Sequence, residues 1–257
     1  PSQRVTAFNR MSISHHVRRL LRRLMDQSVN RGEEYVALGA DFSRRVVRHL
    51  KRYGIPKGNP RFLGFSTGCL ETLRYLKSRE VQTIVDQFSP GPVEREIVRR
   101  ERECWPGWAA SSPPHCPALD DRVRSEWESA SLILANSAWT REALLREGIE
   151  DERIVLVPAV YEGPVVQKTV SLRHDETLRV LWMGTVGLQK GIQYLVQAAN
   201  RLQNQEIEFL VAGTLDITSH ARSQAPPRMR FLGHVQRDRV DALYRSADVF
   251  VFPTLSD

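Results

Sequence analysis

The fold is decided by residues 180–191, which read VLWMGTVGLQKG. The apolar run at its start predicts a short buried strand, and residues 190–202 predict a helix. Residues 208–212, EFLVA, then predict a second buried strand. A strand, a helix and a strand joined by short turns are typical of a βαβ unit in a parallel sheet. The sequence therefore predicts an α/β fold.

Downstream of this unit the alternation of strands and helices continues. Residues 230–232 and 249–252 predict two further strands, and residues 238–246 predict a helix between them. With the first two strands they predict a doubly wound parallel sheet. The sequence stops at Asp257, just past the last predicted strand, where ligand-binding loops of open α/β sheets lie.

A second βαβ unit is predicted upstream. Residues 132–135, LILA, predict a strand, and Asn136 or Ser137 can cap the helix that follows. Gly148 stands where a left-handed residue commonly ends a helix. Residues 154–157 then predict another strand. This region is therefore predicted to have the same α/β fold.

These patterns divide the chain into two α/β domains. Residues 163–177 begin with Gly-Pro, are polar and show no periodicity, so we expect a linker there. The first domain then covers residues 1–162 and the second covers residues 178–257. Because the second domain has only four predicted strands, we expect it to be truncated.

Charge is unevenly distributed along the chain. Residues 1–60 contain 13 Lys and Arg against 4 Asp and Glu, whereas the whole chain has a formal net charge of +7. Residues 12–26 predict an amphipathic basic helix, and residues 42–52 predict a second basic helix. Such helices are either solvated or dock on an anionic membrane surface. We expect no nucleic-acid partner, because no known binding module or interleaved aromatic pattern accompanies the charge.

The composition argues against several other classes of protein. No apolar run reaches the roughly 18 residues of a membrane-spanning helix, and we expect no secretory signal. The three cysteines are too few for a disulfide framework and lack the paired spacing of a zinc site. We expect His15 and His16 to form a surface pair, and Cys104, His115 and Cys116 to pack in a loop. A cytoplasmic setting fits this composition best.

The turn that follows the strand at 180–183 carries the candidate chemistry. Gly184 and Gly187 let the backbone approach a ligand, the helix start offers a positive dipole, and Lys190 adds a full charge. Together these features favour a bound phosphate or diphosphate. The spacing fits neither a Walker A loop nor a dinucleotide-binding loop. A plain strand–helix turn with a surface lysine is the alternative.

Two other predicted strand ends carry glycine. Gly213 closes the strand at 208–212, and Gly233, His234 and Val235 follow the next strand. The carboxyl ends of parallel strands converge on one crevice, so backbone atoms there are candidates for contact with a nucleotide. Each of these segments, taken singly, is more typical of an ordinary turn than of a ligand site. His234 by itself is more typical of a structural residue.

Five segments in a fixed order carry a family resemblance: residues 178–184, 189–195, 210–213, 231–235 and 243–254. They resemble the donor-nucleotide domain of the retaining family-four glycosyltransferases, the glycosyl transferases group 1, which have the GT-B fold. Residues 136–141 and 154–158 are similar to the segment that precedes the linker in that family. The resemblance implies two Rossmann-like domains facing each other across a cleft, with a sugar nucleotide mainly on the C-terminal one.

The resemblance implies roles for residues of the C-terminal domain. Lys190 matches the lysine that contacts the donor diphosphate, and it is the candidate catalytic residue because its charge would stabilise the leaving group. Thr185 stands where many members have an arginine, so one positive contact is missing or supplied differently. Gly213, His234 and Val235 match positions beside the nucleoside.

Two aspartates complete the candidate substrate contacts. Asp257 aligns with the start of the loop that leads to an acidic motif holding the donor sugar and ribose. The N-terminal domain departs further from the family, because its usual first strand and glycine-rich loop are not visible before residue 4. Asp86 lies in a loop that often supplies a histidine to the transferred sugar. We consider it a candidate for contact with substrate hydroxyls, beside the alternative of a solvated or capping aspartate.

The implied reaction moves a hexose-type sugar from a nucleoside diphosphate to a hydroxyl acceptor with retention of configuration. The acceptor would be a glycan or a lipid-linked molecule, and a basic N-terminal surface would then dock on the inner face of a membrane. We expect no metal or other cofactor, because the sequence has no Asp-x-Asp pair. A sugar-nucleotide epimerase and a non-catalytic nucleotide-binding scaffold are the alternatives.

Overall fold

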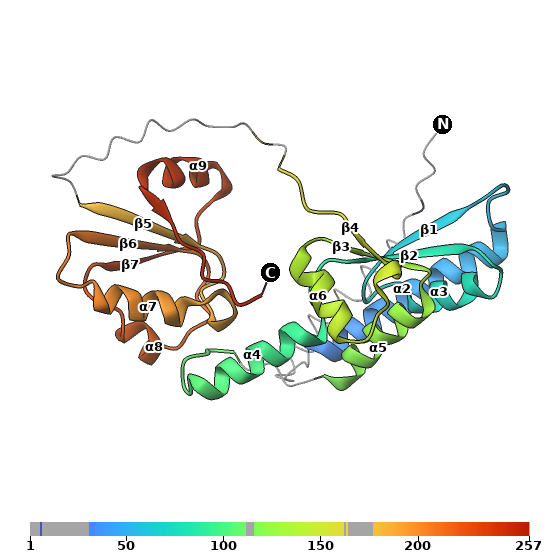
Figure 1. Cartoon of the computed structure of the whole chain (residues 1–257), viewed down its shortest axis with the longest axis horizontal. Coiled ribbons are helices and arrows are strands. Elements are labelled where there is room, and N and C mark those ends of the chain that lie inside the picture. Colours follow the sequence, from blue (N-terminus) through green and yellow to red (C-terminus); the bar gives the residue numbers. More distant parts are fainter. Residues whose placement is uncertain (1–5, 7–30, 112–115, 162, 164–176, 257) are drawn as a thin grey trace, which may run out of the picture. The chain divides into compact units, whose positions relative to one another are not determined.

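The computed structural model describes residues 6, 31–111, 116–161, 163 and 177–256. In this part of the chain, residues 31–92 and 116–159 form one compact unit, the N-terminal unit. Residues 93–111 and 177–256 form a second, the C-terminal unit. Figure 1 labels their helices and strands. The predicted linker lies almost wholly outside the described residues, and the predicted domain boundaries stay predictions.

The N-terminal unit is a parallel sheet with helices packed on one face. Its elements are α2 (Arg31–Tyr53), β1 (Arg61–Phe65), α3 (Leu70–Lys77), β2 (Gln82–Gln87), α5 (Pro117–Ser129), β3 (Leu132–Ala135), α6 (Ala138–Arg146), a 3-10 turn (Asp151–Arg153) and β4 (Ile154–Leu156). The strands lie in the order β1-β2-β3-β4. Figure 1 shows α3, α5 and α6 on the same face of this sheet, with α2 beside them.

Alternate residues of these strands face the helices and form the core. Val85 of β2 packs against Leu73 of α3, and its neighbour in the register, Ile133 of β3, packs against Trp127 of α5. Val85 and Ile133 are fully buried. The indole Nε1 of Trp127 donates to Oε1 of Gln87 at 2.9 Å, so the polar end of this large side chain is satisfied inside the core.

The predicted upstream βαβ unit is confirmed, with one choice resolved. Ser137 caps α6, because its Oγ accepts from the backbone N of Thr140 at 3.1 Å. The side chain of Asn136 accepts instead from Oγ1 of Thr140 at 2.8 Å. Gly148 follows the helix with φ of +85°, as expected for a left-handed helix end.

The C-terminal unit has a parallel sheet of its own. Its elements are α4 (Pro92–Cys104, from residue 93), β5 (Leu178–Met183), a 3-10 turn (Leu188–Lys190), α7 (Ile192–Arg201), β6 (Ile207–Ala212), α8 (Ser219–Ser223), β7 (Met229–Gly233), α9 (Arg237–Ser246) and β8 (Val249–Phe250). The strands lie in the order β7-β6-β5-β8. Figure 1 shows α7 and α8 on one face of this sheet and α9 on the other. The predicted doubly wound arrangement is thus confirmed.

Two predicted boundaries in this unit were wrong. The helix begins at Ile192 rather than at residue 190, because Gly191 has φ of +71°, which helical backbone does not allow. The last strand ends at Phe250 rather than at residue 252. It pairs with β5 only opposite Val180 and Leu181, so its ladder is short.

The segment 93–111 belongs to the C-terminal unit through its packing. Trp108 lies in the core of that unit with Trp182 of β5 and is 6% exposed. Ala109 forms an antiparallel bridge with Ile217, and the backbone N of Thr218 donates to the carbonyl O of Trp108 at 2.8 Å. Trp108 and Ala109, which follow α4 in an irregular segment, therefore contribute to the core of this unit.

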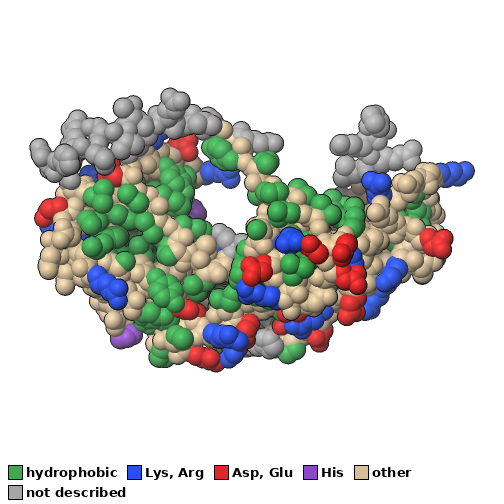
Figure 2. Space-filling model, viewed as in Figure 1, with side chains coloured by type: hydrophobic (Ala, Val, Ile, Leu, Met, Phe, Trp, Pro, Cys, Tyr) green, Lys and Arg blue, Asp and Glu red, His purple; other side chains and the backbone are tan. Residues whose placement is uncertain are grey.

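The two predicted basic helices have different outcomes. Residues 12–26 lie outside the described residues, so that helix stays a prediction. Residues 42–52 are helical as predicted, in the second half of α2, which reaches back to Arg31. Figure 2 shows basic and acidic side chains interspersed over the visible face of the N-terminal unit. Among the described helices, none combines the length and apolar character needed to span a bilayer.

Candidate functional site

The strands β5, β6 and β7 end side by side, and backbone hydrogen bonds connect their ends. The N of Gly184 donates to O of Ala212 at 3.0 Å, and the N of Gly213 donates to O of Gly233 at 2.8 Å. A Cβ added to Gly213, which has φ of +142°, would lie 1.6 Å from O of Gly184. Only glycine allows this approach. Packing of the strand ends therefore requires Gly213, and its contact with a nucleotide stays a prediction.

The turn between β5 and α7 is held by backbone contacts on two sides. The N of Val186 donates to O of Thr214, and the N of Asp216 donates to O of Val186, both at 2.8 Å. On the other side, a Cβ added to Gly191 would lie 1.9 Å from O of Pro253. The turn is therefore fixed before any ligand binds.

Lys190 is the last residue of the 3-10 turn and is half-buried. Its Nζ lies 5.4 Å from the centre of the Phe252 ring, and its carbonyl O accepts from Nε1 of Trp182 at 3.3 Å. The face of an aromatic ring attracts an ammonium group, so Phe252 favours this position of the side chain. The start of α7, two residues later, adds partial positive charge. The turn therefore places a cationic side chain beside a helix start, and its contact with a diphosphate stays a prediction.

A pocket of about 170 Å³ lies beside this turn. Three of the predicted site residues line it, namely Thr185, Gly187 and Lys190. The other lining residues are Leu188, Gln189, Asp216, Val98, Arg102 and Ala109. The structure thus adds residues of the segment 93–111, which sequence analysis did not single out. The alternation of acidic and basic residues at helical spacing was the available signal for that helix.

Side chains of α4 attach this helix to the turn and to α7. Nε2 of Gln189 donates to Oε1 of Glu94. Nε2 of Gln193 and the hydroxyl of Tyr194 both donate to Oε1 of Glu101, at 3.0 Å and 2.6 Å. The bond to Glu101 raises the pKa of Tyr194 above its usual value. The pocket wall formed by α4 is therefore held in place by polar contacts.

The remaining predicted site residues are not among the described residues that line this pocket. Gly213 follows β6. His234 and Val235 follow β7, and His234 is exposed whereas Val235 is half-buried. The prediction of a loop at Asp86 was wrong, because Asp86 is half-buried in β2 and pairs in register with Phe65 and Leu134. Asp257 lies outside the described residues. Contacts of these residues with substrate stay predictions.

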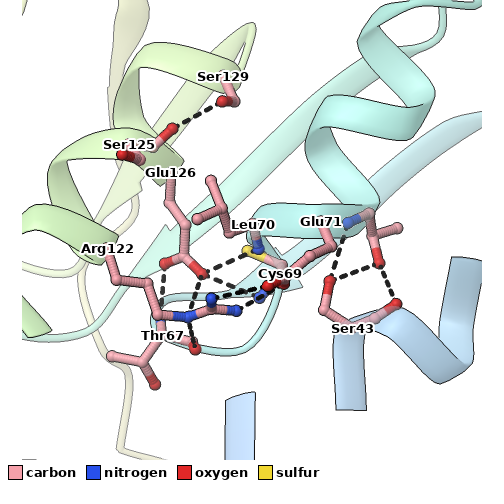
Figure 3. Close-up of polar contacts among 10 residues, drawn as sticks. Ser43, Thr67, Cys69, Leu70, Glu71, Arg122, Ser125, Glu126 and Ser129 are labelled. Carbon is pink, nitrogen blue, oxygen red and sulfur yellow. Dashed lines mark hydrogen bonds and ion pairs between the residues drawn. The ribbon is translucent and has the colours of Figure 1, made fainter. Parts of the chain in front are cut away.

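The start of α3 is another potential anion site, but a carboxylate of the chain occupies it. The buried Glu126 accepts from the backbone N of Cys69 and of Leu70 at 3.0 Å each, and from that of Thr67 at 2.6 Å, as Figure 3 shows. Nε of Arg122 donates to the carbonyl O of Thr67 at 2.7 Å, on the same loop. Burial raises the pKa of Glu126. Glu126 takes the place that an external phosphate would need at this helix start.

Among the described residues, no three His, Cys, Asp or Glu side chains gather in a way that could hold a metal ion. Cys104 and Cys116 are free thiols, one exposed and one buried. His15, His16 and His115 lie outside the described residues. The expectation of a metal-independent site stays a prediction.

Comparison with known sequences points to glycosyltransferases. Residues 177–257 match the model of the family described as Glycosyl transferases group 1. A curated, uncharacterised glycosyltransferase of Methanocaldococcus jannaschii is 32% identical over 95 residues, which make up 35% of this chain and 24% of that protein. The matched part of the chain thus spans about a quarter of that relative.

Comparison with solved structures concerns the fold. The Anabaena protein HepE in complex with UDP and glucose is similar with a TM-score of 0.52 and 16% identity, over 85% of this chain and 56% of that one. TarM of S. aureus is similar with a TM-score of 0.50 and 10% identity, over 86% of this chain and 40% of that one. At such identities the likeness shows the fold alone. Residues 177–257 therefore match a glycosyl transferases group 1 domain, in a chain whose α/β fold with parallel-strand sheets is shared by GT-B glycosyltransferases.

Proposed function

We propose that the chain binds a nucleoside-diphosphate sugar and transfers the sugar to a hydroxyl acceptor with retention of configuration. The pocket beside the turn carries this proposal. Gly187 and Lys190 line it, and α7 begins two residues after Lys190, so a cationic side chain and a helix start lie together within the residues that match glycosyl transferases group 1. The HepE structures with UDP-glucose, and with UDP and glucose, support a uridine nucleotide as the first donor to test.

The chemistry of the transfer explains why positive charge is needed at this position. The bond between the anomeric carbon and the diphosphate oxygen breaks, and its electron pair leaves with the nucleoside diphosphate. A new bond forms between that carbon and the acceptor oxygen, whose proton is released. Negative charge grows on the leaving diphosphate, so Lys190 and the α7 dipole would stabilise the transition state more than the ground state.

The finer assignments belong to the same proposal. The nucleoside would lie beside Gly213, His234 and Val235, and Asp257 would lead into the segment that holds ribose and sugar. Asp86 would contact substrate hydroxyls. The sugar would be a hexose, the acceptor a glycan or a lipid-linked molecule, and no metal would take part. A cytoplasmic setting with docking on an anionic membrane through the basic N-terminal helices fits such an acceptor.

Titration calorimetry with UDP, GDP and ADP tests the binding step. At least one of these nucleotides should bind, and Lys190→Glu should weaken its affinity by roughly tenfold or more, because a charge-assisted contact becomes a repulsion. Arg201→Glu is the matched control. It makes the same charge change at the exposed opposite end of α7 and should leave the affinity unchanged.

Measuring the products formed from the nucleotide sugar, with and without an acceptor, distinguishes a transferase from an epimerase of the same fold. A transferase releases nucleoside diphosphate only in step with glycosylation of an acceptor, whereas an epimerase converts the nucleotide sugar without one. The proposal fails if none of the three diphosphates binds, or if Lys190→Glu and Arg201→Glu have the same effect. It also fails if the nucleotide sugar is epimerised in the absence of acceptor.

A further inference from the structure

We propose that Arg102 of α4 is a second cation of the diphosphate pocket and binds the donor diphosphate together with Lys190. The inference rests on the proposed function, since it assigns a residue to the same nucleotide site. It adds a recognition residue that comes from the segment 93–111 rather than from the glycine-containing turn.

The first observation is the position of the guanidinium. Arg102 lines the same pocket of about 170 Å³ as Lys190, Thr185 and Gly187. Its Nε is buried and has no hydrogen-bond partner among the described residues. Because a guanidinium stays charged at every accessible pH and a buried donor without a partner is unfavourable, the site favours an acceptor that enters the pocket.

The second observation is that α4 offers Arg102 no acidic neighbour. Side chains three and four residues apart face each other on a helix, and the residues at these distances from Arg102 are Val98, Arg99, Trp105 and Pro106. The acidic side chains of α4 are engaged elsewhere: Glu94 with Gln189, Glu96 with Arg99, Glu101 with Tyr194 and Glu103 with Arg99.

Asp216 is the one carboxylate among the described residues that line the pocket. Oδ1 of Asp216 accepts from Oγ of Ser111 at 2.6 Å, and the backbone N of Asp216 donates to O of Val186. The described lining then has two cations against one anion. A planar guanidinium fork matches two oxygens of a diphosphate.

The third observation is that Arg102 is held in place. Two residues that follow it on the chain are anchored in the C-terminal unit: Trp108 in its core, and Ala110, whose N donates to O of Asp216 at 3.2 Å. Before it, Glu101 binds Gln193 and Tyr194 of α7. The backbone of Arg102 is therefore held beside the pocket by its neighbours on both sides.

Titration calorimetry with the diphosphate that binds the unaltered chain tests the assignment. Arg102→Met keeps an unbranched stem of similar length and removes the charge. It should weaken binding by roughly ten- to a hundredfold and reduce the dependence of affinity on salt. Arg102→Lys should recover part of the loss. The control is Arg99→Met, which removes the same charge from an exposed position of the same helix.

Thermal unfolding without nucleotide distinguishes binding from a structural role. Arg102→Met should leave the midpoint unchanged or raise it, because it removes a buried donor that has no partner. A lower midpoint with unchanged affinity would overturn the inference, and so would equal effects of Arg102→Met and Arg99→Met. In either case binding by the unaltered chain would leave the proposed function standing. If the unaltered chain binds no nucleoside diphosphate, both fail together.

Discussion

Replacing Gly191 by alanine should destabilise the C-terminal unit. The residue has φ of +71°, and the added Cβ would lie 1.9 Å from O and 2.7 Å from the carbonyl C of Pro253. Left-handed backbone costs an L-residue about 1–2 kcal/mol. Forcing a methyl group against packed backbone costs about 1–3 kcal/mol more. The free energy of unfolding of this unit should therefore fall by about 2–5 kcal/mol.

Gly233→Ala separates the two contributions. Gly233 has the same φ of +71°, but a Cβ there would meet no described atom within 4 Å. Its substitution should therefore cost only the backbone contribution, about 1–2 kcal/mol. Hydrogen exchange of the β5 and β6 amides along a urea series reports the stability of this unit by itself. If Gly191→Ala costs no more than Gly233→Ala, the segment at Pro253 does not pack on the turn, and the described site geometry is wrong.

Two further substitutions test the attachment of the segment 93–111. Trp108→Ala should lower the stability of the C-terminal unit by about 3–5 kcal/mol, the usual cost of a buried tryptophan, and unchanged exchange of the β5 amides would contradict this placement. Glu101→Gln should bring the raised pKa of Tyr194 back toward about 10 in an ultraviolet titration, with Tyr194→Phe assigning the signal. Because the pKa of Tyr194 is higher in the folded than in the unfolded state, this hydrogen bond contributes its full stabilisation below the unfolded pKa. The contribution is lost as pH rises through the folded pKa. An unchanged titration of Tyr194 in Glu101→Gln would refute the contact.

The sheets were predictable because buried parallel strands are continuous apolar runs. The predicted strands at 132–135, 180–183 and 208–212 are apolar except for Glu208, and the structure has a strand at each of them. The turn at the end of β5 was predictable for a related reason. Its glycines and Lys190 are neighbours in sequence, so their proximity needs no knowledge of tertiary packing.

Boundaries were less predictable where one backbone angle decides them. Apart from Gly191, residues 190–202 have a composition typical of a helix. The left-handed backbone of Gly191 nevertheless moves the start of the helix to Ile192. The close approach of Pro253 fixes that conformation. A contact between residues so far apart in sequence leaves no local pattern.

The part of the pocket contributed by α4 could not be predicted from spacing. A charged helix over residues 92–104 has local signals, with proline at its first position and Glu96 placed to pair with Arg99 and Arg100. These signals predict a helix and do not say which unit it packs on. That information lies in Trp108, because a large aromatic side chain in an irregular segment is commonly buried in a core.

Trp108 also determines which residues reach the proposed diphosphate pocket. The family resemblance implies an arginine at the position of Thr185, so one positive contact is either missing or supplied differently. Since Trp108 draws the segment 93–111 into the core that includes Trp182, the residues just before it must lie along the end of β5. Arg102 is the basic residue of that segment that lines the pocket. A buried aromatic residue in an irregular segment therefore determines which distant basic side chains can reach a site.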